Sequence, residues 1–353
     1  MLRYVPEKEQ PPETWDARAF LSTICGANCR EQRMLVMRST LRVFESGRYA
    51  LPDGRVIVLP RDACTAARAA LHAAVQRLVF AHLPDASALP HAPTHHPVEV
   101  VCGDCVDAAA RLISEGAAGA ASAEAGSRVA LLDMASRQHP GGGYMRGAGA
   151  QEENLCRRSN LWAHLDCNSG SGWGFGRRGK GRSPALYPIP ARGALYARDV
   201  LFVRGNEPGE GYAFLAAPLR VDVVAVAACV RPPTTAAGDY AREEDRAATL
   251  DTVRAALHAC AQNGAHDVVL SALGCGAFRH PPAAVARLFR RALSEYAPCF
   301  RRVVFAIYDD HNAPKSGNYA PFKRILHGFV PGTDPVDFDS GDGVVAGEKV
   351  MKE

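Results

Sequence analysis

The sequence predicts an α/β fold, in which helices cover the faces of a β-sheet. From residue 98 onward, short apolar runs typical of strands alternate with longer stretches at helical spacing, which is the pattern of a layered α/β domain. The chain has 353 residues, more than a typical single domain. Hydrophobic residues make up 47% of it, which is enough for a large core. We therefore expect one large domain with an extension, or two domains.

Residues 1–97 are predicted to form a helical extension that packs on the core and includes a first strand. Apolar side chains recur at helical spacing early in this segment, and glycine and proline then turn the chain into a short apolar run. Asp62 is a suitable N-cap for a further helix. The predicted elements are one or two helices over 13–46, a strand over 55–59, a helix over 62–82 and a proline-rich linker over 83–97.

Residues 98–330 are predicted to form the main domain. The predicted strands are 98–102, 128–133, 200–203, 221–227, 268–273 and 303–307, and the predicted helices are 107–116, 152–165, 241–264 and 282–296. Segment 117–127 is rich in small residues and is expected to be a variable loop. Segment 167–183 is too poor in core-forming side chains to pack regularly, so we expect a mobile loop there. Residues 331–353 are expected to form a frayed tail.

Composition and charge exclude several classes of protein. The formal net charge of +4 is too small for a general nucleic-acid binder, so we expect no sequence-specific nucleic-acid partner. No apolar segment approaches the roughly 20 residues that cross a bilayer, and the N-terminus lacks the apolar core of a secretory signal. We therefore expect a soluble intracellular protein, cytoplasmic or nuclear, in which most of the 11 cysteines behave as small buried hydrophobes.

The stretch 133–160 carries the strongest functional signal. Two groups of residues define it: the triplet Gly141, Gly142 and Gly143 and, after seven further residues, Gln151, Glu152 and Glu153. Glycines let a backbone approach a bulky ligand or adopt a positive φ. The two carboxylates open a predicted helix, where negative charge is favoured in any case. A glycine-rich turn that leads into paired glutamates also suits glycosidic cleavage, because one carboxyl can protonate a leaving oxygen.

This pattern, GGG followed by seven residues and QEE, resembles the signature of poly(ADP-ribose) glycohydrolases. The surrounding sequence DMASRQHPGGGYMRGAGAQEENLC resembles their microbial-type branch. The resemblance implies a macrodomain-like mixed β-sheet flanked by helices, and an enzyme that cleaves ribose–ribose O-glycosidic bonds of poly(ADP-ribose) and releases ADP-ribose without a metal or cofactor. It assigns the general acid to Glu153, contacts with ribose hydroxyls to Glu152, and the fixing of the loop to Gln151.

The resemblance implies further ligand contacts elsewhere in the chain. A second glycine-rich turn is expected to hold the diphosphate of ADP-ribose on its backbone N–H groups; it consists of Gly274, Cys275, Gly276, Ala277 and Phe278. Phe278 is expected to pack on the ribose or base, with a role as core filler as the alternative. Asp104 is the candidate partner of the adenine amino group, although an aspartate beside a glycine is also a common turn residue. Ser136 is expected to contact ribose, where animal relatives carry asparagine.

Two other functions stay open from the sequence. An ADP-ribose-binding protein without activity has the same fold, as has an enzyme that removes mono-ADP-ribose; the adjacent Glu152 and Glu153 argue against simple binding. Cys102 and Cys105 predict no metal site, because neither a second CxxC nor a spaced His pair follows them. We expect a monomer whose partners are poly(ADP-ribose) or ADP-ribosylated proteins.

Overall fold

The computed structural model describes residues 11–24, 29–83, 86–92, 96–119, 128–166, 185–310 and 312–336, without the side chains of residues 117–119. Most of the predicted loop at 117–127, all of the predicted loop at 167–183 and most of the predicted tail at 331–353 lie outside the described residues.

The first part of the chain forms short elements. They are α1 (Ala17–Thr23), α2 (Cys29–Ser46), the paired strands β1 (Arg48–Ala50) and β2 (Val56–Val58), the 3-10 turns η1 (Arg61–Ala63) and η2 (Thr65–Ala67), α3 (Arg68–Ala73), β3 (Gln76–Val79) and η3 (Ala86–Ala88). The rest alternates between strands and helices: β4 (Glu99–Cys102), α4 (Cys105–Gly119), β5 (Val129–Met134), η5 (Tyr144–Arg146), α5 (Gln151–Arg158), α6 (Leu161–Leu165), β6 (Gly193–Arg204), α7 (Glu207–Glu210), β7 (Phe214–Val226), α8 (Glu243–Gln262), β8 (Asp267–Leu270), α9 (Pro282–Glu295), η6 (Ala297–Cys299), β9 (Arg302–Ile307) and α10 (Tyr319–Leu326).

The main sheet confirms the predicted mixed α/β fold. Its strands follow the order β3-β6-β7-β5-β8-β9-β4. The five strands from β7 to β4 are parallel, and β6 runs antiparallel to both β7 and β3. Because β5 and β8 are parallel neighbours, the segments that follow their carboxyl ends meet at the same edge of the sheet.

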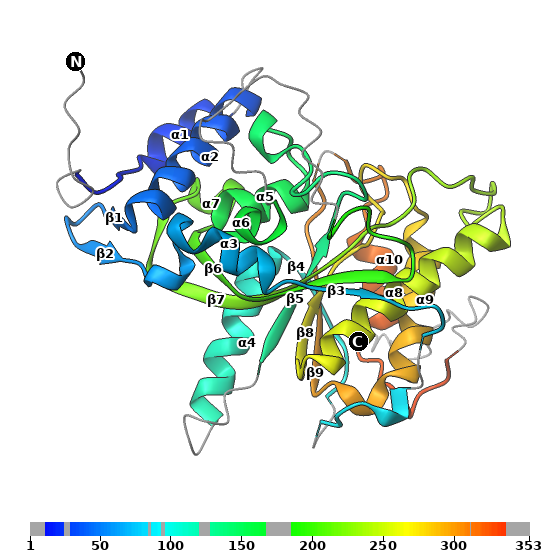
Figure 1. The fold of residues 1–353 in the computed structure, drawn as a ribbon. Helices are drawn as coiled ribbons and strands as arrows, with labels where there is room; N and C mark the ends of the chain where they lie inside the picture. The colour runs from blue at the N-terminus through cyan, green and yellow to red at the C-terminus, as the bar shows by residue number, and fades with distance from the viewer. Residues whose placement is uncertain are drawn as a thin grey trace, which may run out of the picture.

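Helices cover both faces of this sheet (Figure 1). Side chains of α2, α4, α5 and α6 share one buried cluster with one face of the strands. Side chains of α8, α9 and α10 form a second cluster on the opposite face. The sheet is therefore the middle layer of three, and the segments that leave its carboxyl edge can reach both helical layers.

The prediction of one helix over 62–82 is wrong. The helical part ends at Ala73, and the chain continues as β3, which pairs antiparallel with β6 from Gln76↔Tyr196 to Val79↔Gly193. Alanine-rich sequence favours a helix locally, but the hydrogen bonds that β6 offers exist only in the folded sheet. In this way a segment that we assign to the extension joins the main sheet. The division of the chain at residue 97 stays a prediction.

The helix predicted over 152–165 is broken in two. Ser159 is extended, and the side chain of Asn160 accepts a hydrogen bond from Leu201 N at 2.8 Å and donates one to Ala63 O at 3.0 Å. These long-range bonds hold the chain between α5 and α6 against β6. Among the other elements, β6 and β7 extend well beyond the predicted runs, β8 stops at Leu270, and α7 and α10 were not predicted.

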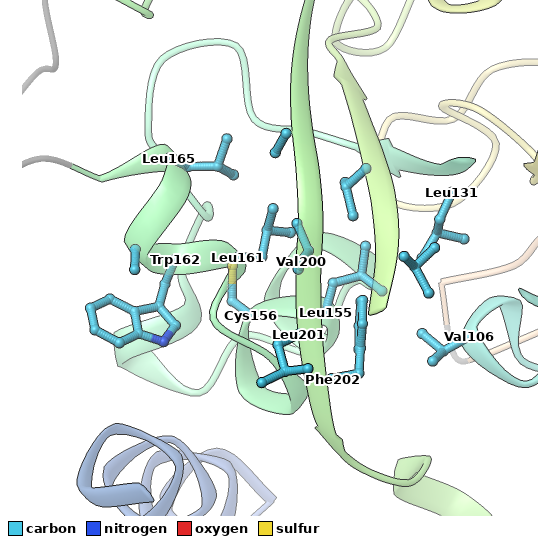
Figure 2. Close-up of a cluster of buried hydrophobic side chains, with 14 of the residues drawn as sticks. Val106, Leu131, Leu155, Cys156, Leu161, Trp162, Leu165, Val200, Leu201 and Phe202 are labelled. Carbon is cyan, nitrogen blue, oxygen red and sulfur yellow. The ribbon is translucent and has the colours of Figure 1, made fainter. Parts of the chain in front are cut away.

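The apolar side of α5 anchors it to the sheet. Figure 2 shows Leu155 and Cys156 of α5 and Leu161 of α6 gathered beside Val200, Leu201 and Phe202 of β6. Leu155, Cys156 and Phe202 are fully buried. The glutamates at the start of α5 are thus carried by a helix whose position is set by core packing.

Within the described residues, no helix is both long and apolar enough to cross a membrane. The cysteines described there are all free thiols. Of the CxxC pair, Cys102 is exposed, and burial raises the pKa of the Cys105 thiol to about 12.

Replacement of Leu155 by alanine tests this anchor. Leu155 has no exposed surface, and its truncation should lower the free energy of unfolding by about 3 kcal/mol, because a cavity replaces well-packed methyl groups. The control is Leu35→Ala, at a side chain that is 45% exposed, where we expect a change of about 0.5 kcal/mol. Urea unfolding followed by circular dichroism measures both. Equal losses in the two variants would contradict the anchoring role.

Candidate active site

Strand β5 ends in a buried carboxyl group, that of Asp133. Its side chain has no exposed surface, and neither of its oxygens has a hydrogen-bond partner among the described residues. An unpaired carboxylate is strongly disfavoured in such surroundings. Burial, and to a lesser degree the charge of Glu153, raise the pKa of Asp133 to about 8.

The glycine triplet follows β5 and folds over the start of α5. Gly141 and Gly142 have φ values of 65° and 59°, a region that side chains disfavour. A Cβ atom on Gly142 would lie 2.5 Å from Glu153 Oε1 and 2.9 Å from Glu152 Oε2. Only glycine therefore lets the loop lie this close to both carboxyl groups.

Each glutamate is held through one oxygen by the backbone of this loop. Ser136 N donates to Glu152 Oε2 at 2.7 Å, and Gly143 N donates to Glu153 Oε1 at 2.8 Å. The other oxygens, Glu152 Oε1 and Glu153 Oε2, are buried and have no partner among the described residues. Both side chains are therefore oriented through one oxygen only, and the second oxygen has no protein partner among the described residues.

The two glutamates differ in depth. Glu152 is 3% exposed and Glu153 is 8% exposed. Burial raises the pKa of Glu152 well above its usual range, the nearby Asp133 raises it further, and the hydrogen bond from Ser136 N acts against this rise. Asp133, Glu152 and Glu153 form one group, which we call the carboxyl cluster. The raised pKa values of Asp133 and Glu152 favour their protonated forms near neutral pH.

Gln151 fixes the start of α5 to β5. Its Oε1 accepts from Met134 N at 2.8 Å, and its Nε2 donates to Leu132 O at 2.6 Å. The amide is therefore used on the backbone of the strand, and its influence on the site is through position. Ser136, the predicted ribose contact, has its hydroxyl oxygen 3.2 Å from His139 N, from which it accepts a hydrogen bond.

The turn formed by residues 274–278 follows β8 and so lies at the same edge of the sheet as the glycine triplet, which follows β5. Gly274 has φ 75°, and a Cβ there would lie 2.7 Å from the ring of His280. The Cys275 side chain is buried, whereas Ala277 is exposed. Phe278 is partly buried and packs against the core on the α8 side, and a Cβ on Gly276 would make an ordinary contact with Asn312 Cβ at 3.6 Å.

Asp104 lies further along the edge, directly after the outermost strand β4. Its Oδ1 accepts from Val106 N and Asp107 N and so caps α4, and both its oxygens pair with Arg158 Nη1 at 2.8–2.9 Å. Two strands, β9 and β8, lie between β4 and β5 in the sheet. The structure thus gives Asp104 a structural task, and its adenine contact stays a prediction.

Sequence reasoning did not assign roles to Asp133 and Tyr187. Tyr187 is buried, its hydroxyl has no partner among the described residues, and burial followed by the charges of Glu152 and Asp133 raises its pKa well above the usual value. Asp133 had a signal in the sequence, a carboxyl at the end of an otherwise apolar run. Tyr187 had none, because only the fold brings it to the carboxyl cluster.

Comparisons with known proteins agree with this geometry. The sequence model described as "Microbial-type PARG, catalytic domain", where PARG stands for poly(ADP-ribose) glycohydrolase, matches residues 37–204. A comparison with curated protein sequences gives no match. Among solved structures, PARG from Thermomonospora curvata is 30% identical with a TM-score of 0.64, over 84% of this chain and 99% of that one.

Two ligand complexes are also similar to this chain. The Thermomonospora curvata enzyme bound to the inhibitor ADP-HPD is 28% identical, with a TM-score of 0.61 over 84% of this chain and 99% of that one. The Deinococcus radiodurans enzyme in complex with ADP-ribose is 28% identical, with a TM-score of 0.55 over 73% of this chain and 96% of that one. The extent and identity of these matches show that the chain belongs to the microbial-type poly(ADP-ribose) glycohydrolase family.

Proposed function

We propose that the carboxyl cluster hydrolyses the ribose–ribose O-glycosidic bonds of poly(ADP-ribose) and releases ADP-ribose, with Glu153 as the general acid. The observation that carries this proposal is the shared geometry of Glu152 and Glu153. Each has one oxygen fixed by a loop N–H and the other buried without a partner. A carboxyl oriented in this way can transfer a proton to a defined atom of a bound sugar.

The chemistry needs one proton and one water. Glu153 gives its proton to the 2′-oxygen of the leaving ADP-ribose unit while the bond to the anomeric carbon breaks through an oxocarbenium-like state. The resulting carboxylate then takes a proton from the water that attacks this carbon, which restores the acid. Glu152, the deeper of the two, accepts hydrogen bonds from ribose hydroxyls. Its raised pKa and that of Asp133 keep protons within the cluster.

The two glycine-rich turns would hold the substrate from both sides. The triplet at 141–143 covers the carboxyl groups, and the turn at 274–278 offers backbone N–H groups to the diphosphate. Their support comes from the sheet, because parallel neighbours β5 and β8 bring both turns to one edge. The relatives with bound ADP-HPD and ADP-ribose have the ligand chemistry that this arrangement suits.

Replacement of Glu153 by glutamine removes the acid and keeps the shape of the side chain. We expect kcat on labelled polymer to fall by about 10² to 10⁴, the usual contribution of a positioned general acid. Affinity for ADP-ribose, measured by calorimetry, should change little. Glu244→Gln, at an exposed position on α8, is the control and should retain full activity. Undiminished release of ADP-ribose by the Glu153→Gln protein would refute the assignment.

Replacement of Gly142 by alanine should displace the carboxyl groups. The new methyl group would meet both glutamates, and a misplacement of about 1 Å can cost roughly a hundredfold in rate. Gly264→Ala is a matched control, because Gly264 also has a positive φ, 76°, but its added Cβ would contact nothing within 4 Å. Similar kcat losses in both variants would indicate backbone strain rather than a collision with the glutamates.

The raised pKa of Asp133 makes stability depend on pH. A carboxyl with a folded-state pKa of about 8 and an ordinary value of 3.8 favours the folded state at low pH, and this contribution is lost as the pH rises toward and through 8. Between pH 5 and 8, the free energy of unfolding of the natural protein should fall as the pH rises. In Asp133→Asn this fall should be smaller by more than about 1.4 kcal/mol, the equivalent of one pKa unit. Urea titrations at several pH values measure this, with exposed Asp53→Asn as the control. If the free energy of unfolding changed with pH equally in the Asp133→Asn and natural proteins, Asp133 would not be protonated in the folded state.

A further inference from the structure

Three arginines follow three neighbouring strands at the edge of the sheet that carries the site. The order of these strands is β7-β5-β8, and all three are parallel (Figure 1). Arg137 follows β5, Arg231 follows β7, and Arg279 follows β8 directly after the turn at 274–278. We call these three residues the arginine rim. Their positions in the topology bring them to one place although they are far apart in sequence.

Contacts between the connecting segments place the rim residues near one another. Arg231 N donates to Phe278 O at 2.9 Å, next to Arg279. Cys229 Sγ lies 3.5 Å from His280 Nε2, on the other side of Arg279. Burial raises the pKa of the Cys229 thiol, the charge of Asp245 raises it further, and the charges of Arg137 and Arg242 act against this rise. Arg137 is therefore within electrostatic reach of the same segment.

The rim carries positive charge that the protein does not neutralise. All three side chains are exposed, and among the described residues none has a carboxylate partner. Two nearby arginines differ: Arg242, directly before α8, pairs with Asp245 at 2.7 Å, and Arg287 of α9 pairs with Asp239 at 3.1 Å. Unpaired guanidinium groups suit bidentate recognition of phosphate.

The backbone of the rim is also unusual. Arg231 and Arg279 have φ values of 51° and 59°, in the left-handed region that residues with a Cβ disfavour. Such positions cost free energy and gather at ligand-binding sites when the surrounding structure maintains them. Here the bond from Arg231 N to Phe278 O ties the two strained segments together.

The charge changes sign along the edge of the sheet. Asp309 and Asp310 follow β9, the strand next to β8 and on the opposite side of it from β5 and β7. A polyanion bound at the edge is therefore attracted toward the ends of β5 and β7 and repelled from the end of β9. This asymmetry gives an extended substrate one preferred direction away from the carboxyl cluster.

We propose that the arginine rim binds the diphosphate of the ADP-ribose unit adjacent to the one being cleaved, and so acts as a polymer subsite. The inference rests on the proposed function and extends it to substrate length. The bound unit's own diphosphate is assigned to backbone N–H groups of the turn at 274–278, whereas the rim side chains are exposed and belong to segments around that turn. The rim thus favours poly(ADP-ribose) over a single ADP-ribose group.

The test replaces all three rim arginines by glutamine. In the active protein, KM for long polymer should rise roughly tenfold while kcat changes less than about twofold, because the rim contributes charge rather than chemistry. The dependence of log KM on log salt should fall by about 1.4, since a diphosphate presents two phosphates and each phosphate contact on a single-stranded polyanion contributes about 0.7. Affinity for free ADP-ribose should stay within about twofold.

Two controls accompany the triple variant. Replacement of the same arginines by lysine keeps the charge and should restore most of the polymer affinity. Arg324→Gln neutralises an exposed arginine of α10 and should change nothing. Arg324 precedes the segment in which Gly328 N bonds to Val98 O, ahead of β4, so it lies toward the opposite edge of the sheet.

Polymer binding is also measured with Glu153→Gln as the parent protein, so that the result does not depend on hydrolysis. Unchanged polymer affinity and salt dependence in the triple variant would overturn the subsite. An equal loss of ADP-ribose affinity would overturn it too, because the rim would then serve the bound unit itself. If the natural protein releases no ADP-ribose from polymer, the proposed function fails, while the binding comparison still decides the role of the rim.

Discussion

The site depends on the close burial of carboxyl groups against a loop that has no side chains in the way. Asp133, Glu152 and Glu153 share a region from which water is largely excluded, and their mutual repulsion would favour opening. Two backbone N–H groups of the loop offset this by binding one oxygen of each glutamate. The loop can approach so closely only because Gly142 lacks a Cβ. The burial and the orientation of these carboxyl groups therefore follow from one packing arrangement.

The surrounding fold maintains this arrangement from two directions. Gln151 ties the first turn of α5 to the end of β5 through both ends of its amide group. Further along the helix, Leu155 and Cys156 hold it against the sheet by core packing. A hydrogen-bonded start and an apolar body give the helix little freedom to shift, so the two glutamates in its first turn keep a fixed position.

The sequence predicted most elements of the main domain and the motifs of the site, because helical periodicity, apolar runs and glycine triplets are local signals. The failures have long-range causes. Strand β3 is amphipathic sequence that becomes a strand only beside β6, and the break between α5 and α6 reflects bonds from Asn160 to distant backbone groups. Tyr187 carries no local signal in the sequence, and Asp133 carries only that of a carboxyl at the end of an apolar run. The groups that surround both side chains are set by the fold and not by spacing in the chain.

The pairing of β3 with β6 has a practical consequence for the boundaries of the catalytic unit. A shortened protein that began after the proline-rich linker would lack β3, and β6 would become an edge strand with unpaired N–H and C=O groups. Exposed edge strands pair with strands of other molecules. Such a fragment would tend to self-associate even with every residue of the carboxyl cluster present, so the smallest autonomous enzyme begins upstream of Gln76.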